Sequence, residues 1–147
     1  MRLCLIAACL FSLVCLVQGQ NPQLIKTDKI EGIICTNFAD WSFDVSAKEF
    51  WTPTKKDVFT AEEQIEAYLK TDPHHPDILR KLPGYKRQYV GIIVDGHKRI
   101  FCRFYCWLPE PLSDQPIFVS DGGECYFRIQ YDFVDKKCHD FWVNGSV

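Results

Sequence analysis

The amino-acid sequence predicts an α+β fold, in which one main helix packs on a curved antiparallel sheet of four to five strands. The first observation is a segment between Pro53 and Pro73 whose hydrophobic residues recur at helical spacing. The second is that from Tyr85 onward the pattern alternates with a period of two and is divided by turn-forming residues. Together they predict helix first and sheet second.

Residues 1–19 have the pattern of a cleavable signal peptide. Arg2 supplies a positive start, and an apolar run of about 15 residues follows, with Val17 and Gly19 at the −3 and −1 positions of a cleavage site. A membrane anchor is the alternative, but a transmembrane helix needs ~20 apolar residues. Cleavage predicts a secreted, extracellular chain that begins at Gln20.

Removal of this segment sets the composition of the mature chain. Loss of Arg2 takes the basic residues from 17 to 16 against 19 acidic residues, so the net charge changes from −2 to −3. Mixed charges of nearly equal number give no reason to expect nucleic acid or an anionic membrane as a partner, and no later segment is apolar enough to span a membrane. The predicted division is a signal peptide at 1–19, an N-terminal segment at 20–50 and an α+β domain at 51–147.

The N-terminal segment is expected to form a tail followed by short extended or irregular pieces. We predict a tail over residues 20–34 that leads into an extended piece, Ile30–Cys35. The stretch from Trp41 to Trp51 is expected to pack as an irregular or short-strand segment, because it carries several large apolar residues: Trp41, Phe43, Val45, Phe50 and Trp51.

The main helix is predicted to begin at Thr52-Pro53 or at Thr60. Proline suits the first helical turn, and Thr60 with Glu63 has the spacing of a capping box. One side of the helix carries the apolar residues Val58, Ala61, Ile65, Tyr68 and Leu69. It is expected to end near residues 71–73, and a short second helix is predicted from Pro76 to Leu82.

The strands are predicted from the alternating pattern and its turns. Asp95-Gly96 is a typical hairpin turn, and Asp121-Gly122-Gly123 marks another turn. The predicted strands are 89–95, 98–108, 117–120, 124–133 and 137–144.

Strand alternation separates two faces of this sheet. The inward face is predicted to hold Ile100, Cys102, Phe104, Cys106 and Leu108 from one strand, and Cys125, Phe127, Ile129, Tyr131 and Phe133 from another. The opposite face is rich in arginine and aromatic residues, which anchor many protein interfaces. It is a candidate binding face, unless these long side chains simply cover the sheet: Arg99, Phe101, Arg103, Tyr105, Trp107, Tyr126 and Arg128.

Five cysteines remain after signal-peptide removal, and all are disulfide candidates: Cys35, Cys102, Cys106, Cys125 and Cys138. Cys102 and Cys106 are ~13 Å apart along one strand, too far to bond to each other. Because five is odd, one thiol is expected to be buried and inert. The alternatives are an intermolecular bridge or redox chemistry, and the second would make the protein an enzyme.

No catalytic residues, metal ligands or cofactor are predicted. His74-His75-Pro76-Asp77 is a weak metal-binding alternative, and the Cys-x₃-Cys spacing does not resemble a zinc finger. Adjacent Cys138 and His139 point to opposite faces of a strand, so they do not form a nucleophilic pair. Asn144-Gly145-Ser146 is a possible glycosylation sequence.

A helix followed by an antiparallel meander in a small secreted chain resembles the cystatin-type roll. Inhibitory cystatins block papain-like proteases with an N-terminal glycine, a Q-x-V-x-G hairpin and a Pro-Trp hairpin. The nearest matches here are 88–92 (Gln-Tyr-Val-Gly-Ile), with the glycine one position early, and 107–109 (Trp-Leu-Pro), in a different order. The resemblance implies a cystatin-like roll as the fold and protease inhibition as an alternative function.

Residues 50–145 are also similar to small secreted cystatin-like proteins of no assigned function. The shared text is Trp51-Thr52-Pro53-Thr54, then 85–89, Asp121 to Phe127, and Val143-Asn144-Gly145. These sequence segments correspond to a helix cap, the start of a strand, a tight turn and the end of the chain. The expected function is a non-enzymatic extracellular binding or matrix-associated structural module, whose partner is an extracellular protein or matrix component.

Overall fold

The computed structural model describes residues 21–42, 45 and 47–145. The predicted signal peptide, the new N-terminus at Gln20 and the expected packing of Phe43 lie outside the described residues. Within the described part of the chain, no helix combines the length and apolar character needed to cross a membrane.

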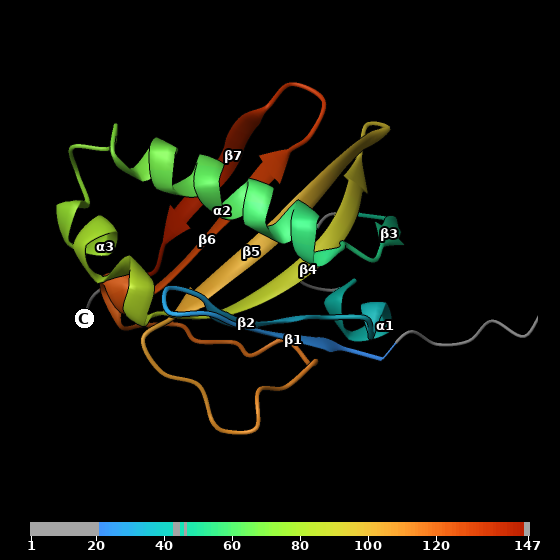
Figure 1. Cartoon of the computed structure of the whole chain (residues 1–147), viewed down its shortest axis with the longest axis horizontal. Helices are drawn as coiled ribbons and strands as arrows, with labels where there is room; N and C mark the ends of the chain where they lie inside the picture. The colour runs from blue at the N-terminus through green and yellow to red at the C-terminus, as the bar shows by residue number, and fades with distance from the viewer. Residues whose placement is uncertain (1–20, 43–44, 46, 146–147) are drawn as a thin grey trace, which may run out of the picture.

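A mixed seven-stranded sheet forms the centre of the fold (Figure 1). The path of neighbouring strands is β1-β2-β4-β5-β6-β7, and β3 pairs with β4 beyond the end of β2. Strand β2 runs parallel to β4, and every other pairing is antiparallel. The strands are β1 (Gln23–Lys26), β2 (Glu31–Ile34), β3 (Glu49–Trp51), β4 (Lys86–Val94), β5 (His97–Tyr105), β6 (Tyr126–Asp132) and β7 (Lys137–Val143).

The α+β class is confirmed, whereas the prediction of four to five antiparallel strands was wrong. The difference comes from the N-terminal segment, which supplies β1, β2 and β3 to the same sheet as the later hairpins. Gly91 explains how β3 comes so close to β4. A Cβ atom at Gly91 would lie 2.1 Å from the backbone oxygen of Trp51, so only glycine fits there.

Helix α2 (Lys55–Leu69) has Thr54 rather than Thr60 as its N-cap residue. The Thr54 hydroxyl accepts from the backbone N–H of Asp57, and the Asp57 carboxylate accepts from the backbone N–H of Thr54, which completes a capping box. The predicted Thr60–Glu63 box was therefore wrong: Thr60 lies inside the helix and its hydroxyl donates to the backbone oxygen of Lys56. The remaining helices are α1 (Phe38–Trp41), α3 (Pro76–Lys81), η1 (Leu82–Gly84) and η2 (Gly123–Cys125).

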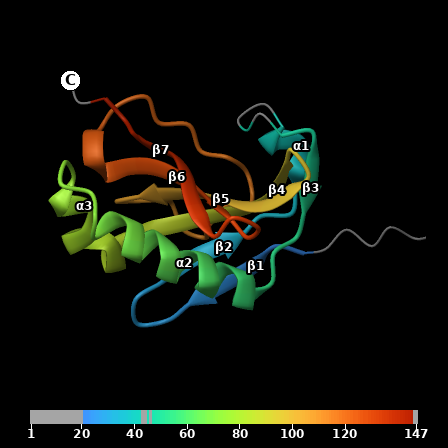
Figure 2. The ribbon, with the colours of Figure 1, turned by 90° about the horizontal axis from the view of Figure 1, so that it is seen from above.

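The sheet carries a hydrophobic core on each face. On the first face, the apolar side of α2 packs on the sheet, with Val58 and Ile65 in one buried cluster with Ile100 and Ile129. Figure 2 shows α2 and the long connection before β6 on opposite sides of the sheet. The second core contains Trp41, Val90, Ile92, Phe101, Tyr105, Leu108 and Leu112.

The connection 106–122 covers the second core without forming a strand, so the predicted strand at 117–120 was wrong. Side chains of the sheet hold it instead of a backbone ladder. The amide of Gln88 donates to the backbone oxygens of Ser113 and Gln115, at 2.8 and 2.7 Å. The Tyr105 hydroxyl lies 2.7 Å from the side-chain oxygen of Gln88 and 3.1 Å from the backbone oxygen of Ile117, and its single proton is donated to one or shared between the two.

Candidate binding surface

The predicted Arg/aromatic face is only partly exposed. Phe101 and Tyr105 are each 3% exposed, because the connection 106–122 and α1 cover them. Their assignment to an exposed binding face was therefore wrong. Trp107 is 67% exposed, and the other four members are half-buried: Arg99, Arg103, Tyr126 and Arg128.

Two arginines of this face lie side by side in the sheet. Arg103 on β5 pairs directly with Arg128 on β6, and Arg128 pairs in turn with Trp142 on β7. Side chains that pair in this way lie on the same face, with Cβ atoms ~5 Å apart. Like charges directly opposite each other are destabilising, so the local environment of each of the two arginines has to be considered.

Aromatic rings fix the Arg103 guanidinium. Its central carbon lies 5.1 Å from the ring centroid of Phe118, 5.6 Å from that of Trp41 and 5.8 Å from that of Phe101. One of its nitrogens donates to the backbone oxygen of Ile117 at 2.8 Å. Arg103 is thus held in place by cation–π contacts and by the connection that it supports.

Arg128 has a different environment. No hydrogen bond or ion pair joins its side chain to any other residue in the described ranges, although it is half-buried. It lines a cavity of about 230 Å³ together with Arg103, Tyr126, Phe118, Trp142 and Asn144. A second cavity, of about 430 Å³, lies beside it and includes Gln130 and Asp140 in its lining.

Two exposed aromatic side chains flank the first cavity, and strand alternation did not assign either of them to the candidate face. Phe118 is 66% exposed and Trp142 is 60% exposed. Trp142 could have been found by alternation along β7, but its alignment with Arg128 depends on a register shift between Arg128 and Gln130. We call Arg103, Arg128, Phe118 and Trp142 the arginine–aromatic surface.

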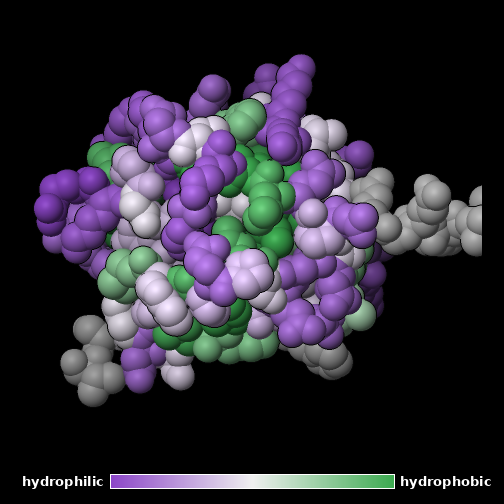
Figure 3. Space-filling view, turned by 60° about the horizontal axis from the view of Figure 1, so that its bottom comes forward, coloured by the Kyte–Doolittle hydropathy of each residue, from purple (hydrophilic) through white to green (hydrophobic). Residues whose placement is uncertain are grey.

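The face that Figure 3 brings forward carries β1, β2 and the connection 106–122, and hydrophobic side chains gather near its middle within a hydrophilic surround. On these elements the most exposed large hydrophobic residues are Leu24, Trp107 and Phe118. Part of the arginine–aromatic surface therefore belongs to a connection that already exposes apolar area.

Asn144 closes one side of this surface. Its side-chain amide donates to the backbone oxygens of Val119 and Asp121, at 2.5 and 3.3 Å. The possible glycosylation site is therefore also an anchor for the connection 106–122. Use of the sequence by a glycosyltransferase stays a prediction.

One pair of the five cysteine candidates is joined. Cys106 and Cys125 form a disulfide with Cα atoms 4.9 Å apart, one step beyond the pairing of Tyr105 with Tyr126. Cys106 is exposed, so its predicted inward position was wrong: β5 ends at Tyr105 and the alternation ends with it. Leu108 likewise packs in the second core rather than in the first.

The other three cysteines are free thiols: Cys35, Cys102 and Cys138. Burial raises the pKa of all three, to about 11 for Cys138. A raised pKa keeps the thiol protonated, and the thiolate is the nucleophile. The arrangement thus gives no support to redox chemistry at these positions.

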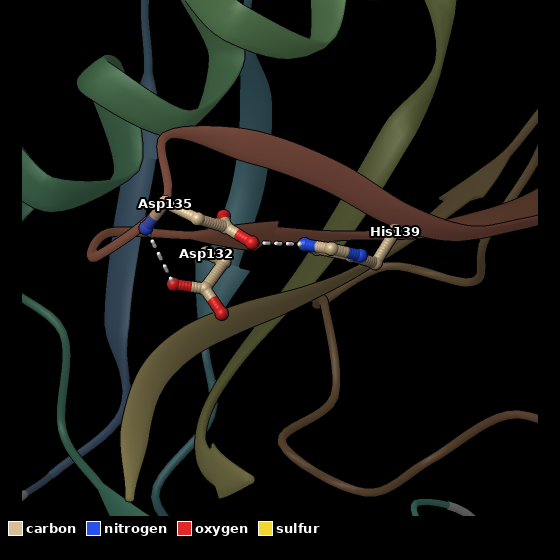
Figure 4. Close-up of side chains that lie close together, drawn as sticks. All are labelled: Asp132, Asp135 and His139. Carbon is tan, nitrogen blue, oxygen red and sulfur yellow. Dashed lines mark hydrogen bonds and ion pairs between the residues drawn. The ribbon is translucent and has the colours of Figure 1, made fainter. Parts of the chain in front are cut away.

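Asp132, Asp135 and His139 form a cluster whose ligand atoms lie within 4.8 Å of one another (Figure 4). Burial alone would raise the pKa of Asp132, but hydrogen bonds from the backbone of Val134 and from His97 and Arg99 outweigh it and lower the pKa to about 2. Both carboxylate oxygens already accept hydrogen bonds, one of them from Arg99 at 2.8 Å. The cluster is explained as the anchor of the β6–β7 turn.

The side chains of residues 74–77, which the sequence offered as a weak metal-binding alternative, do not form a cluster of ligand atoms among the described residues. Nδ1 of His75 lies 2.7 Å from a carboxylate oxygen of Asp72, while Asp77 forms an ion pair with Arg80.

The two cystatin-like segments occupy different environments. Residues 88–92 lie in β4, a central strand, where Gln88, Tyr89 and Val90 are fully buried. Trp107 is exposed, whereas Leu108 is buried. The first segment therefore forms no exposed hairpin tip.

Comparison of the chain with family models, with curated proteins and with solved structures gave no match.

Proposed function

We propose that this chain is a secreted, non-enzymatic extracellular protein that binds a protein or matrix partner through the arginine–aromatic surface. The observation that carries the proposal is Arg128, a half-buried arginine opposite a second arginine and without a counter-charge within 4 Å in the described structure. A carboxylate on the partner would supply that charge and accept two parallel hydrogen bonds from the guanidinium group.

The surroundings of Arg128 suit a protein partner. Phe118 and Trp142 expose apolar area on either side of the cavity, and aromatic residues beside arginine are typical of energetically important interface positions. The net charge of the mature chain is negative, which argues against a polyanion spread over a large area. We therefore expect an acidic residue next to an apolar residue in the bound segment.

The signal-peptide pattern of residues 1–19 supports secretion. The Cys106–Cys125 disulfide is compatible with an oxidising compartment.

Selection of a displayed random peptide library on the immobilised mature chain tests the proposal. We expect enriched peptides to carry Asp or Glu beside an apolar residue, and Arg128→Ala to weaken their binding at least tenfold. Arg80→Ala, a matched exposed arginine on α3, should leave binding unchanged. Equal binding to wild type, Arg128→Ala and Trp142→Ala would overturn the proposed surface.

Inhibition of papain-type cysteine proteases is the alternative, supported by the sequence resemblance at residues 88–92. It is tested by titrating papain with the mature chain. An absence of inhibition at micromolar concentration removes this alternative. Stoichiometric inhibition that survives Arg128→Ala would instead replace the binding module as the proposed function.

A further inference from the structure

A third cavity, distinct from the two beside Arg128, lies on the opposite side of the sheet, between α2, η1 and the β1–β2 turn. Its volume is about 460 Å³, within the range of small-molecule sites. Its apolar walls are formed by Ile30, Phe59, Leu79, Leu82 and Pro83. Glu62 and Arg87 also line it and belong to a buried polar network.

The network uses every nitrogen of Arg87. Nε donates to Oε1 of Glu62 at 3.1 Å, and the two terminal nitrogens donate to the backbone oxygens of Leu82 and Tyr85. Tyr89 adds a second hydrogen bond to Oε1 of Glu62, at 2.7 Å. Each nitrogen of Arg87 therefore already donates one hydrogen bond within the protein.

Only one of the two carboxylate oxygens of Glu62 accepts hydrogen bonds from the described residues. Its Oε1 atom accepts both hydrogen bonds, whereas Oε2 has no partner in the part of the chain that the structure describes. The Glu62 side chain is 7% exposed. A buried carboxylate oxygen without a donor is costly, so a ligand that donates a hydrogen bond is favoured beside it.

The rim of the cavity favours a positive ligand. Three carboxylates line it, from Asp28, Glu63 and Glu66, against one lysine, Lys29. Glu66 also forms an ion pair with Lys70 at 2.7 Å, so Asp28 and Glu63 supply most of the uncompensated negative charge of the rim. The unpartnered oxygen and the acidic rim therefore both select a cationic donor.

We propose that this cavity binds a small organic ammonium ion with an apolar body. The ammonium group donates to Oε2 of Glu62, and the apolar body contacts Phe59, Leu79 and Leu82. This site is independent of the arginine–aromatic surface, which lies on the other face of the sheet.

Octylamine, used below its micelle concentration, is a suitable probe, and octanoate is the matched anion. Titration of the ¹⁵N-labelled mature chain should give saturable amide shifts confined to α2, η1 and the β1–β2 turn. We expect octanoate to bind at least tenfold more weakly. Equal affinity for the two probes, or shifts spread over the whole sheet, would overturn the proposal.

Glu62→Gln tests the role of the unpartnered oxygen. The amide oxygen can still accept from Arg87 and Tyr89, which leaves the NH₂ group toward the cavity. Octylamine affinity should fall at least tenfold while octanoate affinity rises. Glu49→Gln, at an exposed carboxylate on β3 outside the cavity lining, is the matched control and should leave octylamine affinity unchanged.

A second variant covers the case in which Glu62→Gln does not fold. Phe59 is 38% exposed, so Phe59→Ala should preserve the fold and weaken octylamine several-fold by removing one wall. Phe118→Ala, on the opposite face, should leave it unchanged. Unaltered binding by Phe59→Ala would refute the site.

Discussion

The two faces of the sheet are covered in different ways. Helix α2 satisfies its own backbone hydrogen bonds and needs only an apolar side to pack on the sheet. The connection 106–122 has no such internal ladder and is held by hydrogen bonds to groups outside it, among them the side chains of Gln88, Arg103, Asn144 and Trp41 and the backbone of Thr36 and Asn37. The connection 106–122, which we call the irregular cover in contrast to the helical cover α2, therefore depends on groups most of which are far from it in sequence. It also borders the arginine–aromatic surface.

The largest effect is expected under the helical cover. Arg87→Met leaves Glu62 buried without its ion pair, which should lower the free energy of unfolding by about 3–5 kcal/mol. Urea denaturation measures it. Adding Glu62→Met should recover much of the loss. A double variant no more stable than the single one would contradict this explanation.

The next effect belongs to the irregular cover. Replacing Cys106 and Cys125 together with serine opens a loop closed over a sequence separation of 19 residues, which should cost about 3 kcal/mol. The same denaturation experiment measures the change. Cys138→Ser, which breaks no disulfide, serves as the control.

Asp132 predicts a pH dependence of stability at the β6–β7 turn, which belongs to neither α2 nor the connection 106–122. Its pKa in the folded protein, about 2, is below the ordinary value of 3.8. Its stabilisation is therefore complete above about pH 4 and is lost as the pH falls toward 2, and it amounts to about 2 kcal/mol. Unfolding measured from pH 7 to pH 2 should show this loss in wild type and less of it in Asp132→Asn. Parallel curves would contradict it.

The smallest expected loss of stability comes from a substitution that affects the connection 106–122 and leaves α2 unaffected. Gln88→Met keeps the side-chain volume but removes the donors to Ser113 and Gln115, at a cost of about 1–2 kcal/mol. Hydrogen exchange should accelerate in residues 106–122 and stay unchanged in α2. Gln64→Met, an exposed glutamine on α2, should alter neither region.

Helix α2 and strands β4 to β7 could be predicted from the sequence because each has a clear period over seven or more residues. Strands β1, β2 and β3 have three or four residues each, and β2 finds its parallel partner more than fifty positions away. Local patterns predicted an extended piece at Ile30–Cys35 and an irregular or short-strand segment at Trp41–Trp51, but they did not predict that these segments pair with β4. The helix start was ambiguous because Thr54 with Asp57 and Thr60 with Glu63 have the same spacing.

The candidate site shows the same limit. Alternation correctly placed Phe101, Arg103 and Tyr105 on one face, but not which of them stays exposed. Exposure depends on the path of the connection 106–122, which is set by long-range hydrogen bonds. Phe118 lies on that connection, so its position beside Arg103 is equally a tertiary result.

Glycosylation of Asn144 would compete with the hydrogen bonds that its side-chain amide makes in the folded protein. A glycan on its amide nitrogen would remove one of the two N–H donors that hold Val119 and Asp121. A glycosyltransferase must therefore reach the asparagine before the connection 106–122 closes over the second core. In cells that express the full chain, the fraction that carries this glycan, measured by mass, would then report the lifetime of the state in which β7 has not yet paired with β6.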